Sequence, residues 1–114
     1  MAFDINVTQH KRVDVVAVNG RIDSSTAPQF EAAVQKIIDA ERFRIVVDLS
    51  KTDYMSSAAF RVLISVHKQV HKGTRRGDIR IAGASSKLME TFKLGGFDEL
   101  FKFYPDQVSA VGSF

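Results

Sequence analysis

The sequence contains no cysteine and no tryptophan, and it has only two prolines among 114 residues. Without cysteine, the chain can form no disulfide, supply no thiolate nucleophile and offer no sulfur ligand to a metal. No apolar run approaches the roughly twenty residues that cross a membrane, and residues 1–12 lack the apolar core of a secretory signal. We therefore expect a cytoplasmic protein that does not act at a membrane.

The sequence also has little net charge, since it contains 16 Lys and Arg residues and 13 Asp and Glu residues. Basic residues gather only in "HKQVHKGTRRGDIR", His67 to Arg80, which we predict to be a helix end and the following loop. Positive charge there complements the carbonyl end of a helix dipole, so it has a structural reason. We expect no nucleic-acid partner.

Strand patterns open the chain. Residues 3–9 and 12–20 alternate or are rich in Val, and the polar join between them predicts an antiparallel hairpin. Gly20 is predicted to end the second strand. The apolar run at residues 44–50 is typical of a central strand covered on both faces, and residues 78–83 and the end of 97–104 predict two more strands.

Helix patterns alternate with these strands. Phe30, Val34 and Ile37 recur at helical spacing after a cap at Ser25 or Thr26, with Pro28 in the first turn. Further helices are predicted from Ser57 to Lys72, from Ser85 or Ser86 to Gly95, and after Pro105. The order predicts a single α/β domain over residues 1–114, with about four helices and a mixed, mainly parallel sheet of about five strands.

Groups that could form a catalytic or metal centre are few. His67 and His71 lie four residues apart, but no acidic third ligand is close in sequence, so we expect no metal site. No glycine-rich phosphate loop is present, and Asp48 and Asp53 flank a predicted loop where carboxylates commonly accept backbone hydrogen bonds. We expect no enzymatic activity and no cofactor.

The stretch "DYMSSAAFRVLIS", Asp53 to Ser65, places Ser56 and Ser57 between the central strand and the second helix. One interpretation is an N-cap, which contributes about 1 kcal/mol. The other is a modification site, because a helix N-terminus stabilises an added phosphate whose charge would repel a docked partner. The residues alone leave both interpretations open.

Three stretches in this order resemble the STAS domain, the fold shared by bacterial anti-sigma factor antagonists and the cytosolic tails of sulphate transporters. They are "NGRIDSSTAPQFEAAV", "IVVDLSKTDYMSSAAFRVLISVHK" and "IRIAGASSKLMETFKLGGFDELFKFY", which together cover nearly the whole chain. The resemblance implies a regulatory binding module, and the alternative is a scaffold or accessory subunit of a signalling or transporter complex that is not phosphorylated.

In antagonists of this family, the serine that matches Ser57 is phosphorylated by a partner that is both anti-sigma factor and serine kinase, with a histidine-kinase-like ATPase fold. The unphosphorylated antagonist binds that partner and frees the sigma factor, and a separate serine phosphatase resets the cycle. The family's Asp and Gly are replaced here by Ser56 and Ala59, which leaves Ser56 as an alternative acceptor. We expect a monomer or weak dimer.

The same resemblance implies a docking face around the acceptor. Its predicted members come from the loop before the first helix, the segment after the central strand and the exposed side of the second helix: Asp23, Ser24, Ser25, Asp48, Ser50, Lys51, Thr52, Asp53, Ser56, Arg61 and Lys68.

Overall fold

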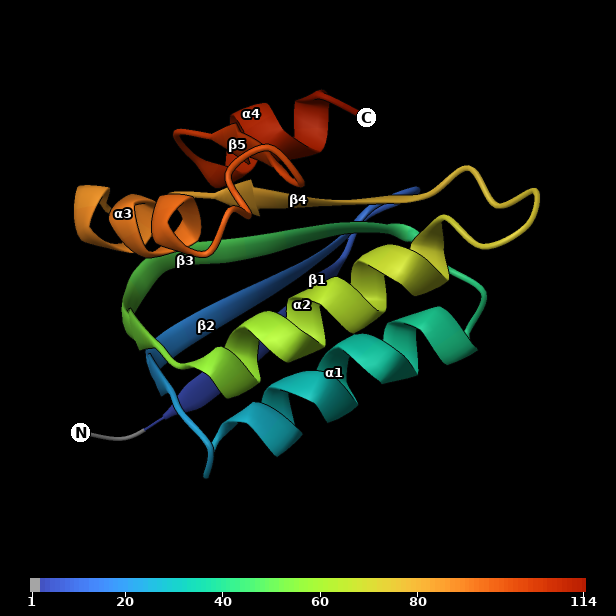
Figure 1. The fold of residues 1–114 in the computed structure, drawn as a ribbon. Helices are drawn as coiled ribbons and strands as arrows, with labels where there is room; N and C mark the ends of the chain where they lie inside the picture. Colours follow the sequence, from blue (N-terminus) through green and yellow to red (C-terminus); the bar gives the residue numbers. More distant parts are fainter. Residues whose placement is uncertain (1–2) are drawn as a thin grey trace.

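A five-stranded sheet with strand order β1-β2-β3-β4-β5 lies between two unequal helical layers (Figure 1). The computed structural model describes residues 3–114. The elements in chain order are β1 (Asp4–Gln9), β2 (Asp14–Ile22), α1 (Ala27–Asp39), β3 (Arg44–Met55), α2 (Ser57–Val70), β4 (Asp78–Ala82), α3 (Ser86–Leu94), β5 (Lys102–Tyr104) and α4 (Gln107–Gly112).

The pairing of the strands confirms the predicted mixed sheet. β1 and β2 are antiparallel, and their turn is closed by the His10 amide, which donates to the Val13 carbonyl at 2.8 Å. β2, β3, β4 and β5 pair in parallel, as the helical crossovers between them require. The α/β fold with an opening hairpin is therefore confirmed.

The larger apolar core lies on the sheet face that α1 and α2 cover. Phe30 and Val34 of α1 and Leu63 of α2 are fully buried there against strand residues such as Val47. Each such side chain contributes roughly 1.5–3 kcal/mol when it leaves water. α3 extends the same core, where Phe92 meets the Phe60 ring edge-on at 4.9 Å between centroids.

The opposite face of the sheet carries a smaller core beneath α4. Val15, Val46 and Ala82 of the sheet pack there with Ala110 of α4. Because Val46 faces α4 while Val47 faces α1 and α2, β3 is covered on both sides. This confirms the prediction of a doubly covered central strand.

Two predicted boundaries on the strands are wrong. β2 runs through Gly20, which has a φ of +108°, and ends at Ile22. β3 likewise continues to Met55 through the polar residues 50–53 that the sequence suggested were a loop. The pairing of β2 with β3 shifts register twice in this region, so bulges absorb the extra residues of β3 while the backbone stays in the ladder.

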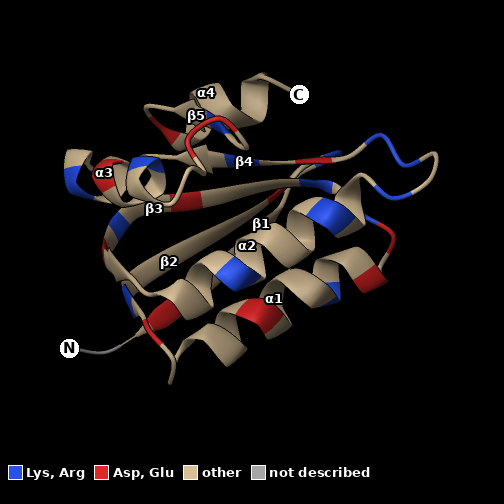
Figure 2. Ribbon diagram, in the orientation of Figure 1, with Lys and Arg blue, Asp and Glu red and all other residues tan. Residues whose placement is uncertain are grey.

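The helix ends follow the predicted chemistry only in part, because Thr26 is the N-cap of α1 by position but its side chain makes no capping bond. α2 ends at Val70, before the predicted Lys72, and Arg75 donates from Nη1 to the Gln69 carbonyl at 2.8 Å. Basic residues do therefore satisfy the carbonyl end of α2, and Figure 2 shows their concentration in the loop that follows it. Within residues 3–114, no helix is both long and apolar enough to span a bilayer.

Candidate functional site

The start of α2 lies at the carboxyl end of β3, beside the end of β2. The Ser56 amide donates to the Ile22 carbonyl at 2.9 Å, and the Ser56 carbonyl accepts the amides of Ala59 and Phe60. Ser56 is thus the N-cap by position, yet its side chain makes no capping bond. Its Oγ is buried and has no hydrogen-bond partner among the described residues, so the capping interpretation of this side chain is wrong.

Ser57 is the first residue of α2 and its side chain is exposed. The amides of Ser57 and Ala58 donate to no backbone carbonyl in the described part of the chain, as expected for the first turn of a helix. These amides and the helix dipole favour a negative group at this end of α2. The Ser57 hydroxyl is therefore accessible, and it lies where a phosphate is tolerated.

An apolar groove, named here the serine groove, opens beside Ser57. It has a volume of about 580 Å³ and extends from the start of α2 to the end of α3. Leu94 is 90% exposed and Tyr54 is 40% exposed, so two large side chains with apolar surface lie together at this groove. The apolar lining consists of Tyr54, Met55, Phe60, Ile64, Leu94 and Phe97.

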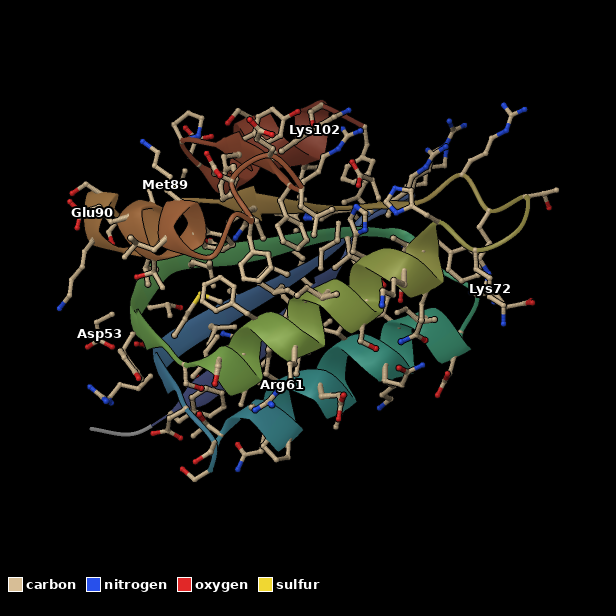
Figure 3. All side chains as sticks on the ribbon, viewed as in Figure 1. Asp53, Arg61, Lys72, Met89, Glu90 and Lys102 are labelled. Carbon is tan, nitrogen blue, oxygen red and sulfur yellow. The ribbon has the colours of Figure 1, made fainter. Side chains whose placement is uncertain are left out.

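Two predicted docking residues continue from the groove along α2. Arg61 lies one turn after Ser57 and lines the serine groove with it. Figure 3 labels Arg61 on α2. Lys68 is exposed further along the helix and lines a second hollow together with Arg61 and Ile64. The exposed side of α2 thus joins Ser57, Arg61 and Lys68 on one surface.

The loop before α1 reaches the same region. Asp23 directly follows Ile22, the residue whose carbonyl holds the Ser56 amide. Asp23 Oδ1 accepts the Ser25 hydroxyl at 2.7 Å and the Ser25 amide at 2.9 Å, so these bonds lower the pKa of Asp23. Ser24 and Ser25 are exposed. The fold therefore brings the predicted loop residues beside the start of α2.

Three other predicted docking residues lie on the opposite face of the sheet. Asp48 Oδ2 accepts a hydrogen bond from Gln107 of α4 at 2.8 Å, and its Oδ1 accepts the Ser50 amide at 2.9 Å. Asp48, Ser50 and Lys51 line a small hollow of about 220 Å³ that Gln107 also lines. These residues belong to β3 and not to a loop, and the hollow that they line shares no residue with the serine groove.

Thr52 and Asp53, the next two residues of β3, differ in how much of each side chain is exposed. Thr52 is only 4% exposed, and its Oγ1 donates to the Val18 carbonyl at 2.9 Å. The prediction that Thr52 contributes to a docking face is therefore wrong, because its hydroxyl is used inside the sheet. Asp53 is exposed near the end of β3, close to the region where α2 begins (Figure 3).

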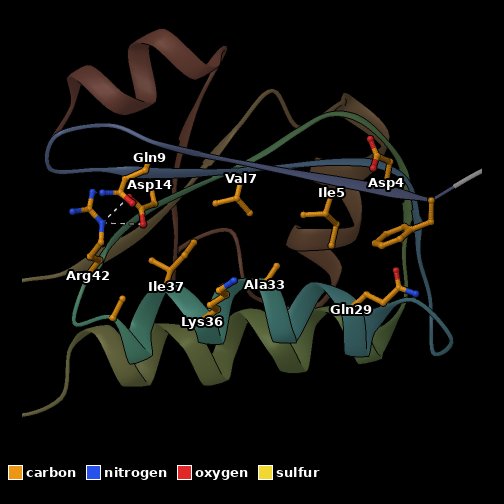
Figure 4. Close-up of a pocket in the computed structure, with 12 residues that line it drawn as sticks. Asp4, Ile5, Val7, Gln9, Asp14, Gln29, Ala33, Lys36, Ile37 and Arg42 are labelled. Carbon is orange, nitrogen blue, oxygen red and sulfur yellow. Dashed lines mark hydrogen bonds and ion pairs between the residues drawn. The ribbon is translucent and has the colours of Figure 1, made fainter.

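A second large groove, of about 700 Å³, lies between edge strand β1 and α1 (Figure 4). Val7 and Ile5 of β1 face Ala33 and Ile37 of α1 across it. At one end, Arg42 Nε donates to both carboxylate oxygens of the buried Asp14, at 2.8 and 3.0 Å. This groove contains none of the residues that the sequence predicted to be functional.

Sequence reasoning missed two features of the surface. Leu94 follows a helical pattern without any sign that it would stand exposed beside Ser57. The sequence showed no acidic ligand close along the chain to the histidine pair, but Asp78 clusters with His67 and His71 in space. Burial, and secondarily the neighbouring His71, lower the pKa of His67.

Comparisons with known proteins agree with this geometry. The family model for the STAS domain matches residues 4–110. BtrV of Bordetella bronchiseptica, named as a candidate anti-sigma factor antagonist, is 29% identical over 100 residues, which cover 88% of this chain and 84% of BtrV. RsfB of Mycobacterium tuberculosis, named as an anti-sigma-F factor antagonist, is 23% identical over 103 residues, which cover 90% of this chain and 82% of RsfB.

Solved structures show the same similarity. An anti-sigma factor antagonist from Mycobacterium paratuberculosis superimposes with a TM-score of 0.86 and 26% identity, over 98% of this chain and 93% of that one. The match to the family model spans nearly all of the described residues. This chain therefore belongs to the STAS domain family.

Proposed function

We propose that this STAS domain is an anti-sigma factor antagonist in a partner-switching pathway. In its unphosphorylated form it binds an anti-sigma factor that is also a serine kinase of the histidine-kinase-like ATPase fold, and the sigma factor is released. Phosphorylation of Ser57 ends this binding, and a serine phosphatase restores it. The names of the relatives support the antagonist role.

The observation that carries the proposal is the contrast between the two adjacent serines. The Ser57 side chain is exposed at the first residue of α2, whereas the Ser56 Oγ is buried. A kinase must bring its phosphoryl donor in line with the attacking oxygen, so only an accessible hydroxyl can react. This favours Ser57 over Ser56 as the acceptor.

We infer that the catalyst of this reaction comes from the partner. In residues 3–114, no side chain that could act as a base makes a hydrogen bond with the Ser57 hydroxyl. A serine hydroxyl is a weak nucleophile until a base removes its proton. The base and the bound nucleotide therefore come from the kinase, and this domain is its substrate and its binding partner.

Phosphorylation would change the docking surface while leaving the fold intact. A phosphate adds about −1.5 to −2 charges at neutral pH. At the N-terminus of α2 the free amides stabilise it, and Arg61 lies one turn away on the same side of the helix. A partner that covers the apolar serine groove would have to desolvate that new charge, which weakens the complex.

The proposal can be tested with the kinase-like anti-sigma factor encoded nearest to this gene. Calorimetry would measure its affinity for the wild-type chain and for Ser57→Ala, each before and after incubation with ATP and Mg²⁺. We expect wild type to lose binding after incubation and Ser57→Ala to retain it. Absence of any complex, or binding of wild type that ATP does not change, would contradict the proposal.

A further inference from the structure

The far end of α2 carries a cluster of side chains that the proposed function does not use. His67 and His71 occupy successive turns of the helix, and their ring centroids are 4.3 Å apart. Asp78 begins β4 after the loop that follows α2, and one ligand atom from each of the three residues lies within 4.8 Å of the other two. We propose that His67, His71 and Asp78 form a binding site for Zn²⁺.

The hydrogen bonds of His71 set which of its nitrogens can bind a metal. Its Nδ1 lies 2.7 Å from the His67 carbonyl oxygen, which can only accept, so Nδ1 carries the proton. In the neutral ring, the lone pair is then on Nε2, which faces Asp78 Oδ1 at 3.4 Å. A ring nitrogen held by a backbone carbonyl is the usual support of a metal-binding histidine.

The separation of His71 Nε2 from Asp78 Oδ1 also fits a shared cation. Two lone pairs that face each other repel unless a proton or a metal ion lies between them. At 3.4 Å the two atoms are further apart than the roughly 2.7–2.9 Å of a charge-assisted hydrogen bond. Ligands at about 2.0–2.2 Å from a tetrahedral zinc are about 3.3–3.5 Å apart, which matches this distance.

The carboxylate of Asp78 is oriented by its other contacts. Oδ2 accepts Arg80 Nε at 2.9 Å, and Oδ1 accepts the Ile79 amide at 3.0 Å. These bonds leave one lone pair of Oδ1 available towards His71. Two imidazoles and one carboxylate suit Zn²⁺ much better than Mg²⁺, which prefers oxygen ligands.

The surroundings make this an open and only moderately strong site. His67 is half-buried, with its ring packed at 5.5 Å from that of Phe101, while His71 is exposed. Water can therefore complete the coordination from the side of His71. The basic loop after α2, coloured blue in Figure 2, lowers the affinity for any cation.

The proposed metal site is separate from the phosphorylation site. α2 has 14 residues, which at about 1.5 Å each place its two ends roughly 20 Å apart. The inference therefore does not rest on the proposed function, and either can fail without the other. A bound cation would join the last turn of α2 to β4.

Calorimetry with ZnCl₂ on chelator-treated protein without a histidine tag would test the site. His71→Ala is the primary variant because this side chain is exposed, and His10→Ala is its control because His10 is exposed in the β1–β2 turn. We expect saturable binding to wild type, unchanged binding to His10→Ala, and at least tenfold weaker binding to His71→Ala. No binding to wild type, or equal binding to His71→Ala, would overturn the proposal.

Asp78→Asn tests the third ligand, because it removes the charge and keeps the size of the side chain. At least tenfold weaker Zn²⁺ binding is expected, and wild-type affinity would overturn the three-ligand assignment. Nitrogen NMR of the histidine rings gives a second readout. Zn²⁺ should shift the ring signals of His67 and His71 and leave those of His10 unchanged, whereas shifts confined to His10 would contradict the site.

Discussion

Two helices of this domain begin with the same pair of residues, Ser-Ser, and the structure uses the two pairs differently. At α3, Ser85 Oγ accepts the Leu88 amide at 3.1 Å, as an N-cap should. At α2, Ser56 has a similar extended backbone, with ψ of 174° against 163° for Ser85, yet its Oγ is buried and caps nothing. The backbone alone therefore does not decide whether a serine caps a helix.

The Ser-Ser pair at α3 has a structural role, whereas the pair at α2 needs another explanation. Ser85 accounts for the pair at α3, where Ser86 is merely the first exposed residue of the helix. At α2, Ser57 is exposed at the corresponding position and also borders the apolar serine groove. The α2 pair thus combines an accessible hydroxyl with a surface suited to a protein partner, and Ser86 serves as its matched control.

The largest effect should come from placing a negative charge at each helix start. Ser57→Asp should weaken binding of the kinase-like anti-sigma factor by at least about 2 kcal/mol, or roughly thirtyfold, because the charge must be desolvated at the interface. Ser86→Asp should leave the affinity unchanged. Calorimetry measures both, and full affinity of Ser57→Asp would favour the scaffold interpretation.

A smaller effect is expected from the apolar wall of the serine groove. Leu94→Ala should lower partner affinity by about 1–2 kcal/mol because it truncates an exposed apolar anchor. Val108→Ala is the matched control, since Val108 is 83% exposed on α4, on the other side of the sheet. Surface plasmon resonance would compare them, and equal losses for the two variants would argue against docking at the groove.

Because Ser85 caps its helix and Ser56 does not, replacing each with alanine should change the stability of the fold differently. Ser85→Ala should reduce the free energy of unfolding by about 1 kcal/mol, since it removes a capping bond. Ser56→Ala should cost close to nothing or stabilise the fold, because it removes a buried hydroxyl without a partner. Urea denaturation measures both, and a larger loss for Ser56→Ala would show that its hydroxyl is bonded.

The smallest effect concerns the start of α1, where Asp23 bonds the Ser25 hydroxyl and the amides of Ser25 and Thr26. These bonds lower the pKa of Asp23 in the folded protein. Its contribution to stability is therefore present above the unfolded value of about 3.9 and is lost as the pH falls through the lower folded value. Carboxyl NMR titration checks this, and a pKa at or above about 3.9 would contradict it.

Much of the fold was predictable because hydrophobic periodicity reports burial directly. Val34 and Leu63, on the two helices of the larger core, lie on stripes that the sequence reveals. The extension of β3 was not predictable in the same way. Its residues 50–53 are mostly polar, and only pairing with β2 through two register shifts keeps them in the sheet.

The candidate site was predictable where it depends on chain order and not where it depends on side-chain packing. The strand–helix junction at Ser57 follows from the sequence pattern, and the resemblance to the STAS family is the source of the role proposed for Ser57. The burial of Ser56 Oγ depends on packing around the start of α2, which no local pattern encodes. The approach of Asp78 to His71 likewise depends on how the loop after α2 returns the chain to the sheet.

The central claim is that, in the two Ser-Ser pairs, only Ser57 joins an accessible hydroxyl to the serine groove and is therefore the residue that the kinase modifies. Wild type, Ser57→Ala and Ser86→Ala would be incubated with the kinase-like anti-sigma factor and ATP, and the modified residue mapped by mass spectrometry. The account predicts phosphate on Ser57 in wild type and in Ser86→Ala, and none in Ser57→Ala. Phosphate on Ser56 or Ser86, or its persistence in Ser57→Ala, would contradict it.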